Sequence, residues 1–210
     1  MIGELYARSL AGAEVDVEDV AGGRVPLDAA RWSEPIDGDE AMLSRCCGPT
    51  LDVGSGPGRL TVALARRGVA ALGIDVTPHA VRLTRRAGGL ALCRDVFGPV
   101  PGAGRWATAL LADGNIGIGG DPLALLRRVR ELVGTGGEVI AEVGAPDSAS
   151  GVDLVRLRRG EEAGPWFRWA RVSARDAPAL AARAGFAGVE LAEDHGRWFA
   201  VLGRPTRSDV

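Results

Sequence analysis

The sequence contains no lysine, so all 25 of its basic residues are arginine. This absence excludes a P-loop, whose lysine contacts phosphates, and any Schiff-base chemistry that needs an amine side chain. The chain also has only two histidines and three cysteines. The adjacent residues Cys46 and Cys47 lack the two-residue gap of a metal-binding pair, and no histidine cluster accompanies them. We therefore expect no metal site.

A surplus of positive charge and a long apolar run are missing as well. The formal net charge is −2 and the sequence pI is about 5.8, whereas a nucleic-acid-binding domain is usually basic. No apolar run reaches the roughly 18–20 residues that a membrane span needs. Residues 1–20 carry several acids and lack the apolar core of a signal peptide. We expect a cytoplasmic protein without a nucleic-acid or membrane partner, and the oligomeric state stays open.

Apolar segments alternate regularly with helical patterns from residue 50 onward. The apolar segments predict strands at 50–53, 69–75, 90–95, 106–113 and 137–143. Capping residues, glycine stops and apolar stripes predict helices between them at 58–68, 77–88 and 121–134. The strands are apolar on both faces, as in a parallel sheet covered by helices on both sides. The sequence therefore predicts an α/β fold with a doubly wound, mostly parallel sheet.

The flanking segments follow a different pattern. Helices are expected at 3–11 and 37–47, separated by a mixed stretch with turn signals. After the alternating region, polar turns and alternating apolar residues predict an antiparallel pair at 151–160 and 165–173. A helix at 173–186 and an antiparallel hairpin at 188–194 and 197–205 close the chain. With 210 residues, the chain is long enough for a single domain with a full core.

The stretch LDVGSGPGRL at 51–60 places three alternate glycines between a strand and a helix. A dinucleotide fingerprint has a third glycine or alanine where this chain has Arg59. Acids also end the first three strands of the alternating region, at Asp52, Asp75 and Asp95. Because these strand ends meet at one crevice, the acids would repel a pyrophosphate there. They suit a ligand with an ammonium, ribose hydroxyls and an adenine amine.

At these residues the chain resembles the class I S-adenosylmethionine-dependent methyltransferases. LDVGSGPGR is similar to their first motif, GIDVTP to the second and RDVF to the third. LLADGN stands where the fourth motif begins, and GTGGEVIAEV resembles the glycine turn and strand that follow. The resemblance implies a Rossmann-like methyltransferase fold whose antiparallel hairpin lies at the C-terminal end. It also implies S-adenosylmethionine as the cofactor and methyl transfer as the activity.

The resemblance divides the single domain 1–210 into functional parts. Residues 1–47 form an N-terminal cap or substrate segment, and 48–143 form the cofactor-binding core. Residues 144–172 form an insertion, and 173–205 form the closing helix and hairpin.

The resemblance also assigns roles to single residues. Asp52 helps hold the ammonium of the cofactor, Asp75 accepts from the ribose hydroxyls and Asp95 accepts from the adenine amine. Asp113 and Asn115 lie beside the methyl group. The full set of cofactor residues that the resemblance implies is Asp52, Gly54, Ser55, Gly56, Gly58, Asp75, Val76, Asp95, Val96, Asp113, Gly114 and Asn115.

Methyl transfer from a sulfonium is an in-line displacement, so the protein mostly aligns and dehydrates the partners. A general base is needed only where the acceptor must lose a proton. Asp113 is the first candidate for this base, followed by His195 and then Glu142. The alternative for Asp113 is an acid that organises its loop, and the alternative for His195 is a solvated turn.

The loop at 113–122 departs from methyltransferases that act on nucleobase or amide nitrogens. Those enzymes often carry a polar residue, two prolines and an aromatic here, and this chain has DGNIGIGGDP. DNA and glutamine methylation are therefore less expected. Aromatic residues concentrate instead in 1–45 and 145–172, including Tyr6, Trp32 and Trp169. They favour a small, partly apolar acceptor.

Two other functions stay open at this point. The chain could bind S-adenosylmethionine and catalyse a reaction other than methylation, or act as a non-catalytic subunit. More remotely, it could be an NAD(P)-dependent oxidoreductase, although Arg59 argues against that fingerprint.

Overall fold

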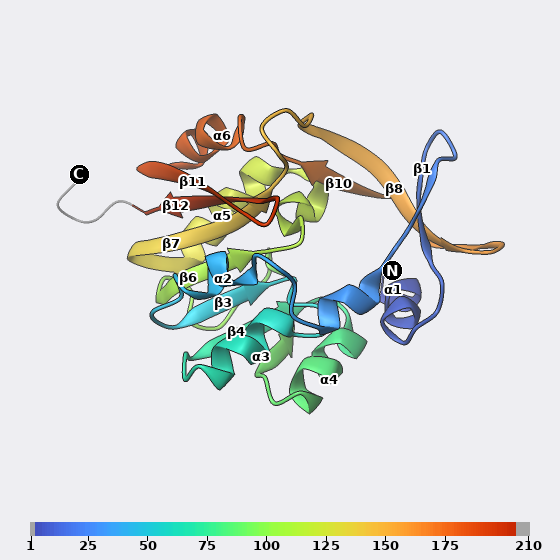
Figure 1. Cartoon of the computed structure of the whole chain (residues 1–210), viewed down its shortest axis with the longest axis horizontal. Coiled ribbons are helices and arrows are strands. Elements are labelled where there is room, and N and C mark those ends of the chain that lie inside the picture. The colour runs from blue at the N-terminus through green and yellow to red at the C-terminus, as the bar shows by residue number, and fades with distance from the viewer. Residues whose placement is uncertain (1–2, 205–210) are drawn as a thin grey trace.

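A computed structural model describes residues 3–204 of the chain. Its central sheet has seven strands in the order β11-β12-β7-β6-β3-β4-β5 (Figure 1). Five of them are parallel: β3 (Thr50–Val53), β4 (Ala71–Asp75), β5 (Ala91–Cys93), β6 (Trp106–Leu111) and β7 (Val133–Val143). The hairpin of β11 (Gly188–Asp194) and β12 (Arg197–Gly203) adds to β7 in antiparallel fashion. The expected α/β fold with a C-terminal antiparallel hairpin is confirmed.

Helices cover both faces of this sheet because neighbouring strand residues point to opposite sides. One face packs against α5 (Pro122–Leu132) and α6 (Ala177–Ala184) and takes residues such as Leu111 and Ala200. The other face packs against α2 (Asp39–Leu43) and α3 (Arg59–Arg66) and takes their neighbours Leu110 and Phe199. The remaining helical elements are α1 (Gly3–Leu10), α4 (Pro78–Arg86) and two 3-10 segments, η1 (Ala29–Ser33) and η2 (Asn115–Gly120).

A second, smaller sheet stands beside the carboxyl ends of the parallel strands. Its order is β10-β8-β1-β2, with the short β9 (Glu162–Ala163) beside β8. Its four main strands are β10 (Phe167–Arg171), β8 (Gly151–Arg159), β1 (Asp16–Asp19) and β2 (Arg24–Pro26). The antiparallel pair β8–β10 matches the prediction, and β1 and β2 were not predicted. In Figure 1 the long strand β8 arches away from the central sheet and crosses β1.

Several predicted boundaries differ from the structure. The helix expected at 37–47 is only α2, so Cys46 and Cys47 lie beyond it. The helix expected at 121–134 ends at Leu132, where Val133 already has extended backbone angles and begins β7. The helix expected from 173 begins at Ala177, because the Ser173 hydroxyl is bound to Asp176 in the turn before it. The strand expected at 106–113 ends at Leu111.

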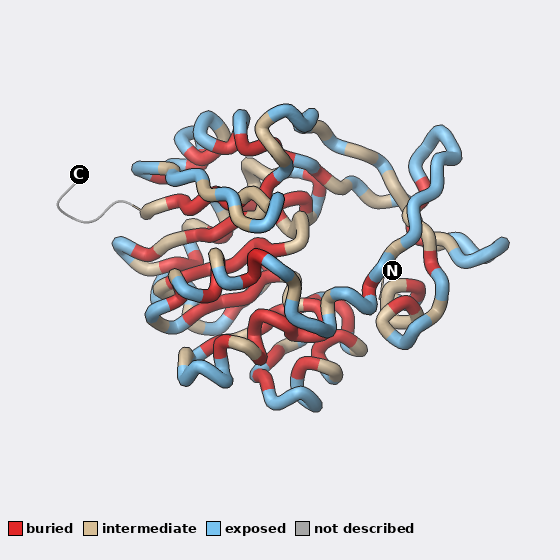
Figure 2. The backbone as a smooth tube through the Cα atoms, in the orientation of Figure 1, coloured by how far each residue is buried: buried red, intermediate tan, exposed pale blue. Residues whose placement is uncertain are grey.

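Burial is concentrated in the central sheet. Figure 2 shows its strands as mostly buried, whereas the small sheet is largely intermediate or exposed. The small sheet therefore owes little of its stability to a core of its own, beyond the cluster of Leu5, Val15 and Leu157. Within 3–204, no helix is long and apolar enough to cross a membrane.

Candidate functional site

A cavity of about 780 Å³ lies between the carboxyl ends of the parallel strands and the small sheet. This volume is in the upper part of the roughly 300–1,000 Å³ typical of ligand sites. The sheet side of the cavity contains every predicted cofactor residue except Gly58 and Gly114. Its other side is formed by residues from α1, η1, β1, β8 and β10. The cavity thus has a polar half with the predicted motifs and an apolar half that the motifs did not indicate.

The glycine loop is held against the second strand of the motif series by Asp75. Its carboxylate accepts hydrogen bonds from the backbone N–H of Gly56 at 3.0 Å and of Thr77 at 2.7 Å. Burial raises the pKa of Asp75, and the two N–H donors oppose that rise. Each carboxylate oxygen keeps a further lone pair beyond these bonds, so Asp75 can still accept from a ligand hydroxyl.

Left-handed backbone at the loop glycines lets neighbouring groups approach closely. Gly54 has a φ of 71°, and a Cβ there would meet the Asn115 amide nitrogen at 2.8 Å. The Asn115 amide donates to the carbonyls of Val53 and Gly54, each at 3.0 Å. Gly56 has a φ of 54°, and a Cβ there would be 3.1 Å from the Tyr6 hydroxyl. The loop is therefore enclosed by Asn115 on one side and Tyr6 on the other.

Gly58 does not contact the cavity, contrary to the prediction. It has a φ of 94°, and a Cβ there would lie 2.4 Å from a Thr84 methyl carbon. Gly58 thus allows α3 and α4 to pack closely. Gly114 likewise precedes η2 in a left-handed conformation and lies outside the cavity lining. Both glycines serve the backbone rather than a ligand contact.

Asp52 is almost fully buried at the base of the cavity. Its carboxylate accepts a hydrogen bond of 2.7 Å from the Thr61 hydroxyl. Burial raises the pKa of Asp52 to about 6, against the lowering effect of that hydrogen bond. A cation arriving in the cavity would relieve the cost of this buried charge.

The third strand end offers a more open contact. Asp95 is exposed, and its carboxylate accepts from the Phe97 backbone N–H at 3.0 Å. Val96 beside it is buried, whereas Val76 and Phe97 are exposed at 59% and 45%. All four residues line the cavity. Two apolar side chains with free surface next to an acid would suit a flat, amine-bearing ring.

Asp113 belongs to a group of five charges, of which Asp39 and Arg59 are buried and the others half-buried. We call it the arginine–carboxylate cluster: Asp39, Arg59, Asp113, Glu142 and Arg197. Arg59 lies 2.9 Å from Asp39 and 3.0 Å from Asp113. Arg197 lies 2.9 Å from Asp39 and 2.8 Å from Glu142. The pKa of Asp113 is raised by burial, and Arg59 opposes the rise. The cluster joins α2, α3, β7 and β12 at the floor of the site.

The backbone of Asp113 is strained as well as anchored. Its φ of 52° lies in the left-handed region, which is uncommon for a residue other than glycine. The Glu142 carboxylate accepts from the Asp113 backbone N–H at 2.7 Å and holds this conformation. Side chains kept in such sparse conformations often have a functional position, so Asp113 is the natural focus of the site.

The other two candidate bases do not reach the cavity. His195 lies in the exposed turn of the final hairpin, and its ring nitrogen contacts only Asp194 among the described residues, at 2.8 Å. The prediction that His195 faces the site is wrong, because the turn carries the ring out into solvent. Glu142 is engaged by Arg197 and by the Asp113 N–H, and it is not part of the lining. Of the three candidates, only Asp113 lines the cavity.

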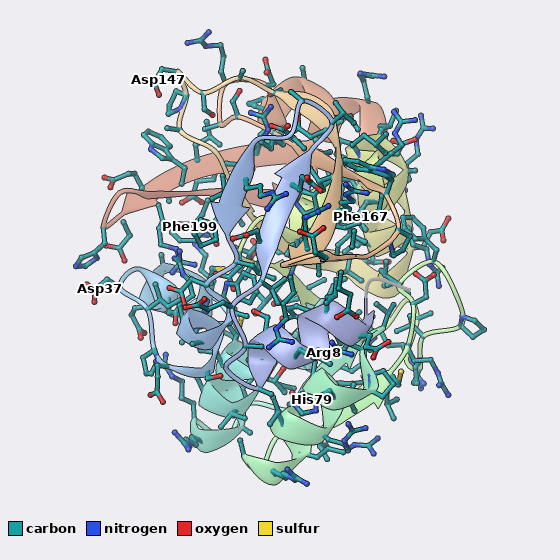
Figure 3. All side chains as sticks on the ribbon, turned by 90° about the vertical axis from the view of Figure 1, so that its right-hand side faces the viewer. Arg8, Asp37, His79, Asp147, Phe167 and Phe199 are labelled. Carbon is teal, nitrogen blue, oxygen red and sulfur yellow. The ribbon has the colours of Figure 1, made fainter. Side chains whose placement is uncertain are left out.

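The apolar half of the cavity brings aromatic residues together from distant segments. The rings of Tyr6 and Trp32 lie 6.1 Å apart, and those of Phe167 and Trp169 pack edge to face at 6.3 Å. Figure 3 labels Phe167 on the small sheet above α1, the helix that carries Tyr6. Burial raises the pKa of Tyr6, and the charges of Asp75 and Asp113 raise it further. Tyr6 therefore stays protonated and can donate a hydrogen bond.

Two other tryptophans, Trp166 and Trp198, lie away from the cavity. Trp166 is outside the lining, and the Arg156 guanidinium stacks on its ring at 4.5 Å. Trp198 packs against the main core. Arg158 lies in β8 with its side chain 15% exposed and pairs with Glu18.

The glycines of the loop at 113–122 allow the small sheet to pack closely against this loop. A Cβ on Gly117 would lie 2.2 Å from the Ala170 carbonyl oxygen, and one on Gly120 would lie 2.3 Å from the Arg168 Cβ. Both contacts are with β10. Of the loop glycines Gly117, Gly119 and Gly120, only Gly119 lines the cavity. The spacing of the glycines in the sequence indicates that another element packs closely against this loop. Nothing in the sequence indicates that this element is β10.

The Arg59 side chain is the main functional feature that sequence reasoning missed. In the sequence, Arg59 is notable only because it breaks a dinucleotide fingerprint. In the structure it is 8% exposed, lines the cavity and holds Asp113. Its partners Asp39 and Arg197 come from segments without any motif, so no pattern could connect them.

Comparison with known proteins gives one relative in sequence and many in structure. No family model matches the chain. The release factor glutamine methyltransferase of Rhodospirillum rubrum is 30% identical over 188 residues, which cover 88% of this chain and 52% of that protein. The chain thus spans about half the length of the curated relative it matches.

Solved structures with the same fold are S-adenosylmethionine-dependent methyltransferases. The enzyme from Bacteroides fragilis, in complex with S-adenosyl-L-homocysteine, superposes with a TM-score of 0.82 at 20% identity over 97% of this chain and 94% of that one. A 1,6-didemethyltoxoflavin-N1-methyltransferase from Burkholderia thailandensis has a TM-score of 0.56 at 18% identity, over 80% and 74%. An amino pentose methyltransferase from Micromonospora echinaspora has 0.57 at 18% identity, over 84% and 90%. The chain has the fold of these enzymes, as its motifs predicted.

Proposed function

We propose that the protein transfers a methyl group from S-adenosylmethionine to a small-molecule acceptor. The observation that carries this proposal is the cavity itself. One half joins the glycine loop to Asp52, Asp75 and Asp95, and the other half is an apolar space that the motifs do not need. A site for one cofactor alone would not require the second half.

The residues present fit S-adenosylmethionine. Gly54 and Gly56 leave a backbone cradle that a Cβ would fill, so an extended ligand can lie against it. The carboxylate of Asp52 is matched to an ammonium, and Asp75 has lone pairs for ribose hydroxyls. Asp95 with Val76 and Val96 would receive the adenine, whose amine donates to the carboxylate. Ser55 and Asn115 complete the wall beside the loop.

When bound, the cofactor would supply a methyl group on a positively charged sulfur, which needs no activation by the protein. The chain then has to orient the acceptor and exclude water. The small sheet and α1 cover the cavity from the side opposite the central sheet. Where the acceptor loses a proton, Asp113 is the side chain that would take it. Its ion pair with Arg59 holds the carboxylate in place.

A second candidate is methylation of a protein amide, because the sequence relative is a release factor glutamine methyltransferase. Two features favour a small acceptor instead. The Asn115 amide nitrogen is already bound to two loop carbonyls, so it is not free to recognise a substrate amide. The small sheet also contributes apolar and aromatic residues to the cavity wall, which suit a small, partly apolar acceptor.

Calorimetry with S-adenosylmethionine and S-adenosylhomocysteine tests the cofactor directly. We expect both to bind, and Asp75→Asn to weaken both, since the amide nitrogen opposes one of the acceptor roles of Asp75. Absence of binding at millimolar concentration would end the proposal, and enhanced NADPH fluorescence would support the oxidoreductase alternative. Mass spectrometry of acceptor reactions then separates methylation, seen as a gain of one CH₂, from another reaction or from binding alone.

Two further expectations stay predictions. We propose that residues 1–47 and 144–172 serve the acceptor while 48–143 serve the cofactor, and that 173–205 close the sheet; Pro205 lies outside the described residues. A cytoplasmic location and the absence of nucleic-acid and membrane partners rest on the sequence arguments alone.

A further inference from the structure

The strand register of the small sheet determines which of its side chains face the cavity. Residues directly opposite each other on antiparallel strands point to the same face. Val17 lies opposite Leu157, Phe167 opposite Val155, and Trp169 opposite Asp153. All six line the cavity, so they form one face of the small sheet, which we call the roof face. The roof face is apolar except for Asp153.

The acid in the roof face is already neutralised. Asp153 is paired with Arg171, whose guanidinium nitrogens lie 2.7 and 3.2 Å from its two carboxylate oxygens. On the opposite side, Asp113 is paired with Arg59. Both acids next to the apolar half thus already have an arginine partner, and a charge desolvated against the remaining apolar side chains would be costly.

The walls of the apolar half are aromatic on two sides. Phe167 and Trp169 project from the roof face, and Tyr6 and Trp32 project from the N-terminal segment. Phe97 lies at the cofactor side with nearly half of its surface free. Aromatic side chains gain most from a flat ring that can stack or meet them edge to face. Arg168 also lines the cavity, but it alternates with Phe167 and Trp169 along β10 and lies opposite Leu154, so its side chain starts from the other face of the small sheet.

We infer that the acceptor is an uncharged, planar aromatic compound that carries a phenolic hydroxyl or a ring N–H, whose oxygen or nitrogen is the nucleophile. This inference rests on the proposed methyl transfer. In the reaction, a lone pair of that oxygen or nitrogen forms the new bond to the methyl carbon. The carbon–sulfur bond breaks with its electron pair remaining on sulfur, and the proton lost from the acceptor goes to Asp113.

Four two-ring probes of similar size test the chemistry of the pocket in the full-length protein saturated with S-adenosylhomocysteine. These probes are 2-naphthol, decahydro-2-naphthol, 2-naphthoate and the ammonium form of naphthalen-2-ylmethanamine. Calorimetry should show that 2-naphthol binds at least about tenfold more tightly than each of the others. Equal or tighter binding of the saturated or charged probes would overturn the inference, and so would failure of all four to bind.

Matched tryptophan variants test whether 2-naphthol binds at the roof face. Trp169→Ala should lower the affinity for 2-naphthol at least about tenfold, and Trp169→Phe should keep most of the parent chain's affinity. Trp166→Ala is the control, because Trp166 lies outside the cavity against Arg156. Both alanine variants should bind S-adenosylhomocysteine like the parent chain. An equal effect of the two alanine variants would contradict a site on the roof face.

The two proposals fail in different ways. If S-adenosylhomocysteine does not bind, the proposed methyl transfer fails whatever the probes do. If it binds and the probes show no preference for the flat neutral ring, the methyl transfer stands and the acceptor class is wrong.

Discussion

Asp52 is an acid in a place where its charge is costly. The folded protein holds its pKa at about 6, above the ordinary value of 3.8, because the side chain is buried. Below about pH 4 the carboxyl is protonated in both the folded and the unfolded states. Between about pH 4 and 6 the unfolded chain releases the proton more readily, so this group lowers the stability as the pH rises. Above about pH 6 the decrease in the free energy of unfolding caused by Asp52 no longer changes with pH.

Asp52→Asn should therefore stabilise the protein without ligand at pH 7.5, by on the order of 3 kcal/mol. At pH 4 the difference from the parent chain should nearly vanish, so the two pH values serve as a mutual control. Urea unfolding at both values measures the effect. A destabilised variant at pH 7.5 would mean that a partner other than water already compensates the Asp52 charge.

Asp52→Asn should also weaken the binding of S-adenosylmethionine, which would explain why an acid stands at this position. An ammonium placed beside Asp52 gains a charge-assisted hydrogen bond that the asparagine oxygen replaces only in part. A buried acid that is unfavourable for folding and favourable for binding is typical of a functional site.

At the scale of elements, Gly117 decides how closely η2 and β10 approach each other. An added Cβ would lie 2.2 Å from the Ala170 carbonyl oxygen and 2.6 Å from the Trp169 indole nitrogen. Gly117→Ala should push β10 away, lower the free energy of unfolding by about 1–3 kcal/mol and weaken the aromatic probe. Gly188→Ala is the control, since nothing lies within 4 Å of that Cβ. Calorimetric melting of both variants checks the prediction, and equal melting temperatures would contradict it.

The arginine–carboxylate cluster connects the final hairpin with the helices on one face of the sheet. Arg197→Met leaves Asp39 and Glu142 buried with fewer partners, and should cost about 3–5 kcal/mol of stability. Arg45→Met is the matched control, because Arg45 pairs with the exposed Glu190 and such pairs contribute about 1 kcal/mol or less. Equilibrium unfolding in urea compares the two. Similar losses would mean that the cluster is no more important than a surface ion pair.

Elements with local signals could be predicted from the sequence, and elements that depend on remote partners could not. The strands and helices of residues 50–143 were found because their apolar pattern and caps lie within each segment. β1 was missed because its sequence, DVED, has the acidic residues that strands usually avoid. It becomes a strand only by pairing with β8, as Val17 does with Leu157.

The site shows the same division. Asp52, Asp75 and Asp95 could be placed together because parallel strands end at one edge. His195 was placed wrongly because the strand pattern fixes the hairpin but not the direction of its turn. The role of Arg59 was invisible, since Asp39 and Arg197 approach it only through the packing of α2 and β12.

At the scale of the whole molecule, the central sheet is well buried while the covering parts hold few buried contacts of their own. A ligand between them should therefore stabilise the covering parts most. S-adenosylhomocysteine at a hundredfold excess over its Kd should add about 2.7 kcal/mol of stability. For a chain of this size that corresponds to a rise in Tm of roughly 5–10 °C.

Hydrogen exchange can show where this stabilisation occurs. We expect the largest gain of protection in α1 and the glycine loop, and little change in α5 and α6, which pack on the far side of the core. Uniform protection along the chain, or none in α1, would mean that the N-terminal helix does not contact the ligand.

The pairing of β1 with β8 also sets the order in which the protein can be built on a ribosome. Val17 leaves the ribosome early, but its partner Leu157 follows only after the parallel strands have been made. At about 5–20 residues per second, the first strand of the small sheet waits on the order of ten seconds for its neighbour. During that interval the nascent chain can assemble the cofactor half without the roof above it. The acceptor half would then take shape after the cofactor half.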